Sequence, residues 1–499
     1  MKRQLLGLAL AGAIIAGCAP PGGGGGTSPG GGGGGGGGGS SICPVPTSGS
    51  NFFFKVFIPP SSGGWVSGAG LLELTTGDIL MVGNYDMLGS KKIFKATLSS
   101  QGAINNSQTV RAGVVNQSQI GHFRSQFHNA LVYSNDGNLF FATSYPSQPN
   151  TIEKIQSDGT SQFIKDLGSN LQIVSLMNSP RTSGGDLITA NIYLTSSSEY
   201  GYYAFSETNG EFVCGGKYGL PAGYKVVSTW VAYDLNFFKC IPIIFGAKKD
   251  GAETDLFIAV SSVSTSRTPP VQFEELIVLP VSGEAQNIDQ VLQISDGYII
   301  LATTGTDSDN NGVPDYDRDT NLDILIIKVD GRLNLSWAKR LGGPKNDTAN
   351  YVIEDGNFII VVGSTFSPDG TGDIFVAKIN KTSGNLEWLK GYNECSQNQD
   401  EDARFIVKGS GGNYHITGFV GGSFTSGKWY PFVLKIDQNG SLQGGCSAEF
   451  TPELAYSDQT ITPTRTSISW PVNDLTNSPS SVSETPEEVT FDSVRAICQ

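Results

Sequence analysis

The sequence lacks the short motifs by which many enzymes are recognised. It has only three histidines, and neither an HExxH zinc motif nor a GxxxxGK[ST] phosphate-binding loop occurs in its 499 residues. Outside the glycine-rich stretch near its start, it also has no GxSxG turn of the kind that exposes a nucleophilic serine. These absences exclude the enzyme classes that a local motif identifies, and we assign no catalytic residue.

Positive charge is scarce as well. The chain has 32 lysines and arginines against 46 aspartates and glutamates, which gives a net charge of −14 and an isoelectric point near 4.7. A chain with this charge is repelled by phosphate backbones and by anionic lipid headgroups. We therefore expect no nucleic-acid partner and no membrane attachment through surface charge.

The first residues have the pattern of an export signal. Met1-Lys2-Arg3 is basic, and the apolar stretch that follows is too short to span a bilayer as a helix. This stretch ends in Ile15-Ala16-Gly17-Cys18, which resembles the bacterial lipobox. The resemblance implies that residues 1–17 are removed as a lipoprotein signal peptide and that Cys18 is lipidated. An ordinary secretory signal with a chance cysteine is the alternative.

Residues 18–51 are predicted to be a tether. Between Ala19 and Ser41 the chain is nearly pure glycine with proline and serine, so it cannot bury apolar surface and should reach about 25–30 Å as a flexible coil. A lipid anchor followed by a tether places the folded part outside the cytoplasm, beside a membrane. By resemblance to lipoproteins of two-membrane bacteria, Ala19 rather than aspartate after the cysteine favours the outer membrane, if the organism has one.

The rest of the chain contains an internal repeat. The stretches "DGYIILATTGT", "DGNFIIVVGST" and "GGNYHITGFVG" each combine a turn with an apolar strand, and a second strand such as "LDILIIKVDG" follows each of them. Strand length, β-branched content and Gly, Asn and Asp turns predict antiparallel hairpins. The repeats close at seven glycine turns: Gly102, Gly159, Gly210, Gly283, Gly331, Gly384 and Gly440.

A closed ring is the arrangement expected for so many hairpins, because a flat array would leave long strand edges exposed. We predict an all-β fold, a β-propeller of seven four-stranded blades over residues 52–448, with six or eight blades as alternatives. "FFFKVFIPP" at Phe52–Pro60 is similar to the fourth strands "SWAKRLGG" and "EWLKGYN". We therefore expect the N-terminal strand to complete the last blade; a loose surface strand is the alternative.

The later repeats resemble a class of bacterial and archaeal propeller repeats with the pattern DGGYIVAG…D.L.KLD..G…W. The match is good over Gln290–Gly440 and degenerate over Ala69–Gly283. Members of this class occur in secreted proteins and lipoproteins and mostly have no assigned activity, so the resemblance implies a fold and not a substrate. Trp337 and Trp388 are also similar to the docking tryptophans of quinoprotein propellers, but we expect them to pack between blades.

The last segment, residues 449–499, is rich in Thr, Ser and Pro, and we predict a small β appendage or strap. Six cysteines follow Cys18, and an even number in an exported chain indicates disulfides. Cys446 and Cys498 bracket this segment and are the pair we expect. The sequence leaves the pairing unassigned for Cys43, Cys214, Cys240 and Cys395.

One loop is far more acidic than the others. Its sequence, Asp-x-Asp-x-Asn-Gly-Val-Pro-Asp from residue 307 to residue 315, resembles the calcium loops of thrombospondin type 3 repeats, dockerins and EF-hands. Calcium takes about six to eight oxygen ligands. The resemblance implies a structural calcium ion held by Asp307, Asp309, Asn311, the Val313 carbonyl, Asp315, Asp317 and Asp319. The usual final acidic position is Arg318, a departure from the pattern, and a solvated acidic loop is the alternative.

These features together predict a membrane-tethered extracytoplasmic module that binds or scaffolds a protein or an envelope glycan. Two alternatives remain at this point. One is a propeller-type enzyme, either a glycan hydrolase or lyase or a quinoprotein-like oxidoreductase, which a cluster of His, Arg and carboxylates in the central funnel would indicate. The other is a structural component of the cell surface.

Overall fold

The computed structural model places the propeller within Ser41–Gln499. The described residues are 52–59, 64–87, 90–112, 114–115, 130–134, 136–144, 150–179, 186–234, 239–250, 253–308, 314–315, 321–367, 371–394, 399–422, 429–442, 448–475, 479–483, 486–488, 491 and 493–498. The predicted signal peptide and tether lie outside this set. No helix among the described residues is long and apolar enough to cross a membrane.

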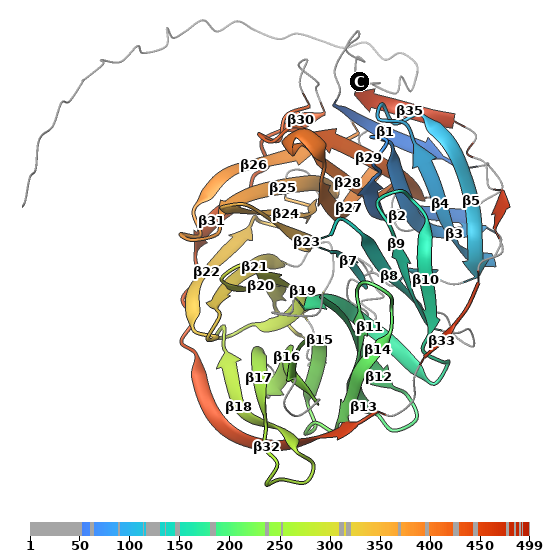
Figure 1. Cartoon of the computed structure of the whole chain (residues 1–499). Helices are drawn as coiled ribbons and strands as arrows, with labels where there is room; N and C mark the ends of the chain where they lie inside the picture. The colour runs from blue at the N-terminus through green and yellow to red at the C-terminus, as the bar shows by residue number, and fades with distance from the viewer. Residues whose placement is uncertain are drawn as a thin grey trace, which may run out of the picture. The chain divides into compact units, whose positions relative to one another are not determined.

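The strand pairings form seven antiparallel blades, as the repeats predicted (Figure 1), and blades 3, 4 and 5 are further joined into one continuous sheet. The first three follow each other in chain order. Blade 1 contains β2 (Gly64–Glu73), β3 (Ile79–Met87), β4 (Ser90–Leu98) and β5 (Ile104–Ala112). Blade 2 contains β6 (Val114–Val115), β7 (Leu131–Tyr133), β8 (Leu139–Ser144), β9 (Thr151–Ile155) and β10 (Ser161–Asp166). Blade 3 contains β11 (Leu171–Ser179), β12 (Leu187–Leu194), β13 (Glu199–Ser206) and β14 (Phe212–Tyr218).

The remaining blades repeat the same order of strands. Blade 4 contains β15 (Tyr224–Asp234), β16 (Lys239–Asp250), β17 (Glu253–Val263) and β18 (Val271–Leu279). Blade 5 contains β19 (Ala285–Ile294), β20 (Gly297–Gly305), β21 (Asp323–Asp330) and β22 (Leu335–Gly342). Blade 6 contains β23 (Asp347–Asp355), β24 (Phe358–Thr365), β25 (Asp373–Asn380) and β26 (Leu386–Tyr392). Blade 7 contains β27 (Gln399–Lys408), a 3-10 turn at Ser410–Gly412, β28 (Tyr414–Gly422), β29 (Trp429–Ile436) and β1 (Phe53–Ile58).

The apolar runs of the middle strands follow from this architecture. Both faces of a blade pack against neighbouring blades, so a middle strand has no solvent face and need not alternate. All nine residues of β20 are buried, and seven of the eight residues of β21 are buried. The inner strands of adjacent blades contact one another around the ring.

The N-terminal strand closes the ring, as its sequence predicted. β1 pairs antiparallel with β29, with Phe53 opposite Lys435 and Val56 opposite Phe432. It therefore takes the place of a fourth strand in a blade whose other strands come from the far end of the propeller sequence.

Tryptophan side chains of two fourth strands explain why two of the closing turns need glycine. Trp337 of blade 5 lies where a side chain on Gly384 of blade 6 would be, 2.9 Å from a Cβ placed there, and the backbone at Gly384 has a φ of +69°. Trp388 stands in the same relation to Gly440, at 2.9 Å. The two tryptophans pack between blades as expected, and these two glycines are required both by contact and by a positive φ.

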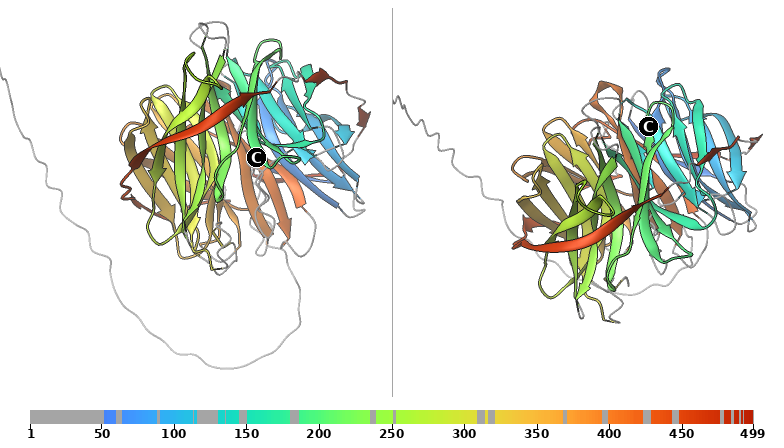
Figure 2. Two further views of the ribbon diagram at one scale, coloured as in Figure 1. Left: turned by 90° about the horizontal axis from the view of Figure 1, so that it is seen from below. Right: turned by 60° about the horizontal axis from the view of Figure 1, so that its bottom comes forward.

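The C-terminal segment is a strap that runs around the outside of the ring (Figures 1 and 2). It contains β30 (Glu449–Phe450), β31 (Ala455–Asp458), β32 (Thr464–Asp474), β33 (Ser480–Ser481), β34 (Glu487–Glu488) and β35 (Ser493–Cys498). All of these strands pair antiparallel with blade strands: β30 with β26, β31 with β22, β32 with both β18 and β14, β33 with β10, β34 with β5, and β35 with β1. The strap therefore pairs with blades 6, 5, 4, 3, 2, 1 and 7 in turn. It runs around the ring against the order in which the blades follow one another in the chain. It is distributed over every blade instead of forming a separate small unit.

Ion pairs accompany the strap around the ring. They are Lys390–Glu449, Lys339–Asp458, Arg465–Glu275, Lys239–Asp474, Lys92–Glu487 and Arg495–Glu394. Most of these partners are partly exposed, and exposed pairs contribute only about 0–1 kcal/mol each. The backbone ladders and a few apolar contacts, such as Trp470 with Tyr224 at 5.2 Å between ring centroids, must supply most of the attachment.

One disulfide joins two blades. Cys214 on β14 of blade 3 is bonded to Cys240 on β16 of blade 4, with the two Cα atoms 6.1 Å apart. The sequence had left this pair unassigned. Cys446 lies outside the described residues, so its pairing with Cys498, which ends β35, stays a prediction.

Candidate functional site

A cavity of about 340 Å³ lies in the central channel at one mouth of the ring. It is lined by residues of the inner strands of blades 2, 3, 5 and 6, which do not all adjoin one another, so it lies inside the ring. The lining residues come from the carboxyl ends of these strands: Leu131, Val132, Tyr133, Leu176, Met177, Asn178, Gln290, Val291, Leu292, Gln293, Ile294, Ser295 and Glu354. We call this space the channel-mouth cavity.

Part of its wall is apolar. Leu131, Leu176, Met177, Val291 and Ile294 are all buried, with exposed fractions of 2 to 6%. These side chains belong mainly to the buried cores of the ring, and only a small part of each reaches the cavity. A ligand in the cavity would therefore contact hydrocarbon on one side.

The two glutamines of the cavity are each held by their side-chain oxygen. Gln293 Oε1 accepts a hydrogen bond from Trp230 Nε1 at 2.6 Å, and Gln290 Oε1 accepts one from the backbone N–H of Val352 at 2.6 Å. Because both partners are donors, the amide orientation is determined. Each glutamine keeps its Nε2 group as a donor for another partner.

Asn178 also lines the cavity. Its Oδ1 atom is buried and has no hydrogen-bond partner among the described residues. An unpaired buried acceptor costs about 1–3 kcal/mol, and native proteins rarely leave one without a reason. Because water does not reach this oxygen, the atom is not presented to a molecule in the cavity.

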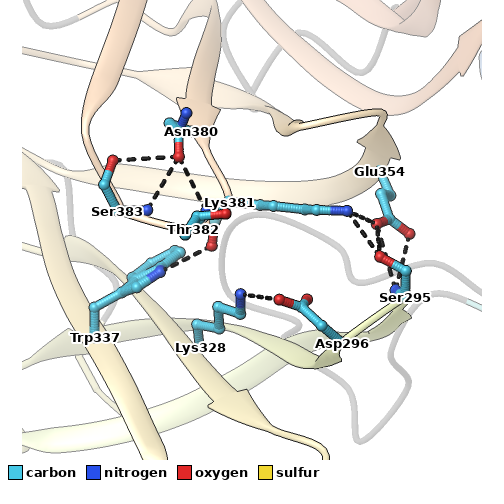
Figure 3. Close-up of polar contacts among 9 residues, drawn as sticks. All are labelled: Ser295, Asp296, Lys328, Trp337, Glu354, Asn380, Lys381, Thr382 and Ser383. Carbon is cyan, nitrogen blue, oxygen red and sulfur yellow. Dashed lines mark hydrogen bonds and ion pairs between the residues drawn. The ribbon is translucent and has the colours of Figure 1, made fainter. Parts of the chain in front are cut away.

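Charged groups surround the mouth, and they are paired with one another (Figure 3). Lys381 forms an ion pair with Glu354 and donates a hydrogen bond to Ser295 Oγ at 2.8 Å. Ser295 donates from Oγ to Glu354 Oε1 at 2.8 Å and from its backbone N–H to Oε2 at 3.2 Å. Next to this group, Lys328 Nζ lies 2.7 Å from Asp296 Oδ2.

The backbone around Lys381 is held as well. Its carbonyl accepts a hydrogen bond from Trp337 Nε1 at 3.0 Å, and Asn380 Oδ1 accepts the N–H groups of Thr382 and Ser383 at 3.0 Å each (Figure 3). These hydrogen bonds hold the backbone of Lys381 in place, and its ammonium group forms an ion pair with Glu354. Among the described residues of the rim, the charged groups Lys381 and Glu354 are paired with each other.

Tyr133 also lines the cavity, and its hydroxyl lies beside the turn at Gly137, 3.4 Å from a Cβ placed there. Burial raises the pKa of the Tyr133 hydroxyl, and the negative charge of Glu73 raises that pKa further. The side chain therefore remains a phenol at neutral pH and can both donate and accept a hydrogen bond.

The histidine and arginine that the structure describes in blade 7 lie elsewhere. His415 on β28 is fully buried, and burial lowers its pKa to about 4 although the charge of Glu73 opposes this, so the ring is neutral at pH 7. Arg404 lies between Asp402, with Nε 2.5 Å from Oδ2, and the Phe419 ring, 5.1 Å from its centroid. Neither residue lines the channel-mouth cavity. Among the described lining residues there is one carboxylate, Glu354, and no histidine or arginine.

The acidic loop leaves β20 of blade 5 and returns to β21, as predicted. Of its seven candidate ligands, the structure describes Asp307 and Asp315; the others, Asp309, Asn311, Val313, Asp317 and Asp319, lie outside the described residues. Asp315 folds back to the base of the loop, where its N–H donates to the Thr306 carbonyl at 2.6 Å and its Oδ2 accepts from the Ser308 N–H at 2.7 Å. Asp307 lies close enough to Lys225 of blade 4 that its negative charge raises the pKa of Lys225, against the stronger lowering by burial.

The sequence contained no signal for the cavity residues. Asn178, Gln290 and Gln293 are isolated amides within strands, and Glu354 resembles any carboxylate before a turn. These residues share only a position near the carboxyl ends of inner strands. This shared position can be recognised only once the blade boundaries are known. The predicted lipidation site, Cys18, lies outside the described residues.

No protein-family model matches the sequence, and no curated protein matches it. Among solved structures, Sqt1 from Chaetomium thermophilum is 12% identical with a TM-score of 0.39, covering 76% of this chain and 97% of that one. The Dos1 propeller is 8% identical with a TM-score of 0.39, covering 77% and 96%. An apocarotenoid oxygenase from Synechocystis is 10% identical with a TM-score of 0.40, covering 81% and 95%. At these scores the likenesses say nothing about function, and the strand pairings themselves show that the chain is a seven-bladed β-propeller.

Proposed function

We propose that the protein is a lipid-anchored, extracytoplasmic binding module that takes its partner at the channel mouth. The observation that carries the binding role is the channel-mouth cavity, which combines a partly apolar wall with two amides whose oxygens are held by protein donors. Such a combination is typical of a preformed recognition site. The lipobox-like start, the glycine-rich stretch and the similarity of the repeats to those of lipoproteins support the extracytoplasmic address.

The anchor is tested by replacing the lipidated residue. Cys18→Ser removes the thiol that would be acylated, and we expect the protein to move from the membrane fraction to the soluble fraction and to lose incorporation of labelled palmitate. Cys43→Ser, in the same N-terminal part of the chain, is the matched control and should remain membrane-bound. Equal partition of the wild type and the Cys18→Ser variant would contradict the anchor.

We further propose that calcium stabilises the acidic loop of blade 5, with Asp307 and Asp315 at its base and Asp309, Asn311, Val313, Asp317 and Asp319 as the remaining oxygen donors. The contact between Asp315 and Thr306 supports this, because it brings Asp315 back to the start of the acidic stretch. An ion that binds the folded loop but not the unfolded chain would increase the stability of the fold.

Calcium should raise the melting temperature of the wild-type protein by a few degrees, and a chelator should reverse the rise. The double variant Asp307→Ala with Asp309→Ala should not respond, because it loses two of the proposed ligands. Magnesium at the same concentration controls for ionic strength. The proposal fails if calcium leaves the wild type unchanged or shifts both proteins equally; thermal melting followed by circular dichroism measures this.

A further inference from the structure

We propose that the junction between blade 7 and blade 1 contains an acid-sensitive latch, with His415 as its sensor and Glu73 as the group that the sensor controls. At this junction the last blade of the ring packs against the first, with β2 in contact with β27, β28 and β29. Neither His415 nor Glu73 lines the channel-mouth cavity. The latch therefore goes beyond the proposed binding role and does not depend on it.

Glu73 joins the two blades at this junction. It ends β2 of blade 1, and its carboxylate accepts two hydrogen bonds from Ser410 in the 3-10 turn of blade 7. The Ser410 N–H donates to Oε2 at 2.7 Å, and the Ser410 hydroxyl donates to Oε1. Asn413 closes the turn, because its Nδ2 group donates to the Ser410 carbonyl at 2.6 Å. One carboxylate of blade 1 therefore holds the β27–β28 turn of blade 7.

His415 lies beside this carboxylate without being bonded to it. Its Nδ1 atom is 4.0 Å from Glu73 Oε2, beyond hydrogen-bond distance, and neither ring nitrogen has a hydrogen-bond partner among the described residues. The side chain is fully buried. The site is closely packed, because a Cβ placed on Gly409 would be 2.4 Å from Glu73 Oε2 and 3.1 Å from His415 Cε1. The imidazole is therefore kept from solvent, next to a carboxylate that already has partners.

Charged groups face His415 from two neighbouring strands. Glu73 on β2 favours the protonated ring, whereas Lys435, which lies opposite His415 on β29, disfavours it. On the other side, β27 places the uncharged Val407 opposite His415. Burial is the largest effect and favours the neutral ring, and it lowers the pKa of His415 to about 4.

Protonation of His415 weakens the latch. The imidazolium competes with Ser410 for Glu73 Oε2, and it places a positive charge in a buried site near Lys435. In the unfolded chain the histidine takes up a proton near its ordinary pKa of 6.5, whereas the folded protein resists protonation down to about pH 4. The folded state therefore binds fewer protons between these two values. The contribution of the neutral ring to stability is complete above pH 6.5 and is lost as the pH falls toward 4.

The test compares acid sensitivity in the full chain, kept in a mild detergent, with and without the imidazole. Denaturant unfolding at about pH 7.5 and at about pH 5 gives an unfolding equilibrium constant for each protein. On going to the lower pH, we expect this constant to rise on the order of tenfold more in the wild type than in His415→Leu. The other titrating groups are common to both proteins, so their effects cancel in the comparison.

His415→Leu removes a side chain that makes no hydrogen bond with the described residues, so the variant should fold and be about as stable as the wild type at neutral pH. If it fails to fold, His415→Gln takes its place, because glutamine does not titrate either. The other two histidines of the sequence give the matched control. His122→Ala with His128→Ala leaves His415 in place and should respond to acid like the wild type.

Hydrogen exchange shows whether the effect is located at the junction. At about pH 5, amides of β2 and of the Ser410–Gly412 turn should exchange faster in the wild type than in His415→Leu, by a larger factor than amides of β12 in blade 3.

Three results would overturn the latch: His415→Leu responds to acid like the wild type, the exchange factor is the same in blade 3 as at the junction, or the control variant loses the acid response. None of these results bears on the binding role of the cavity, which is measured separately.

Discussion

Replacing Phe54 by alanine is expected to destabilise the protein by about 3–5 kcal/mol, the range for removing a large aromatic side chain from a packed core. Phe54 is fully buried on β1, and its ring lies edge-on to Phe432 with 5.4 Å between centroids. β1 is also the strand that joins the two ends of the ring. Loss of its packing therefore weakens the contact on which ring closure depends, in addition to leaving a cavity.

The midpoint of denaturant unfolding, followed by tryptophan fluorescence, measures this effect. Phe450→Ala is the matched control, because Phe450 is a half-buried phenylalanine on the short strap strand β30 and plays no part in joining the ends. We expect a clearly smaller loss for this control. If the two variants lost the same stability, or if Phe54→Ala lay within about 1 kcal/mol of the wild type, the packing of β1 would not close the ring.

Ending the chain after Ala448 is expected to have the other large effect. This truncation removes the strap and exposes the outer strand edge of every blade at once. Open edges are templates for pairing with other chains, so we expect self-association together with a fall in melting temperature on the order of 10 °C. The ring should still close, since β1 and β29 are retained.

Size-exclusion chromatography with light scattering, together with thermal melting, measures both outcomes. The matched control keeps the strap but removes two of its ion pairs through Lys339→Ala and Lys390→Ala. Because partly exposed ion pairs contribute little, this variant should stay monomeric and melt close to the wild type. A truncated chain that remained monomeric and equally stable would show that the strap does not protect the edges.

The local sequence was sufficient for most of the ring. Blade strands such as Gly297–Gly305 and Asp323–Asp330 follow each other in the chain and pair with each other. Their apolar runs and the turns beside them are therefore close together in the sequence. The repeat then made the degenerate copies in the first half of the chain recognisable. It also identified Phe53–Ile58 as a fourth strand that is distant in sequence from the other strands of its blade. The predictions of an all-β fold, of seven blades and of closure by the N-terminal strand are confirmed.

The course of the strap could not be read in this way. Its strands β30, β33 and β34 have only two residues each, too few for a periodic pattern. Each pairs with an edge that exists only once a blade has formed, as when Glu487 lies opposite Thr109. The disulfide between Cys214 and Cys240 is similar, because its partners meet only through the packing of blade 3 on blade 4.

The sequence by itself determined what depends on neighbouring residues: the strands, their turns, the repeat and the acidic loop between two strands of blade 5. Only the tertiary structure decided what depends on closing the ring. It brought Asn178 from blade 3 and Gln290 and Gln293 from blade 5 to one cavity, and it paired Glu354 with Lys381 at the rim. The physical reason is that hydrogen bonding within a hairpin is local, whereas the chemistry of the channel belongs to strand ends that are distant in the chain and adjacent only in the ring.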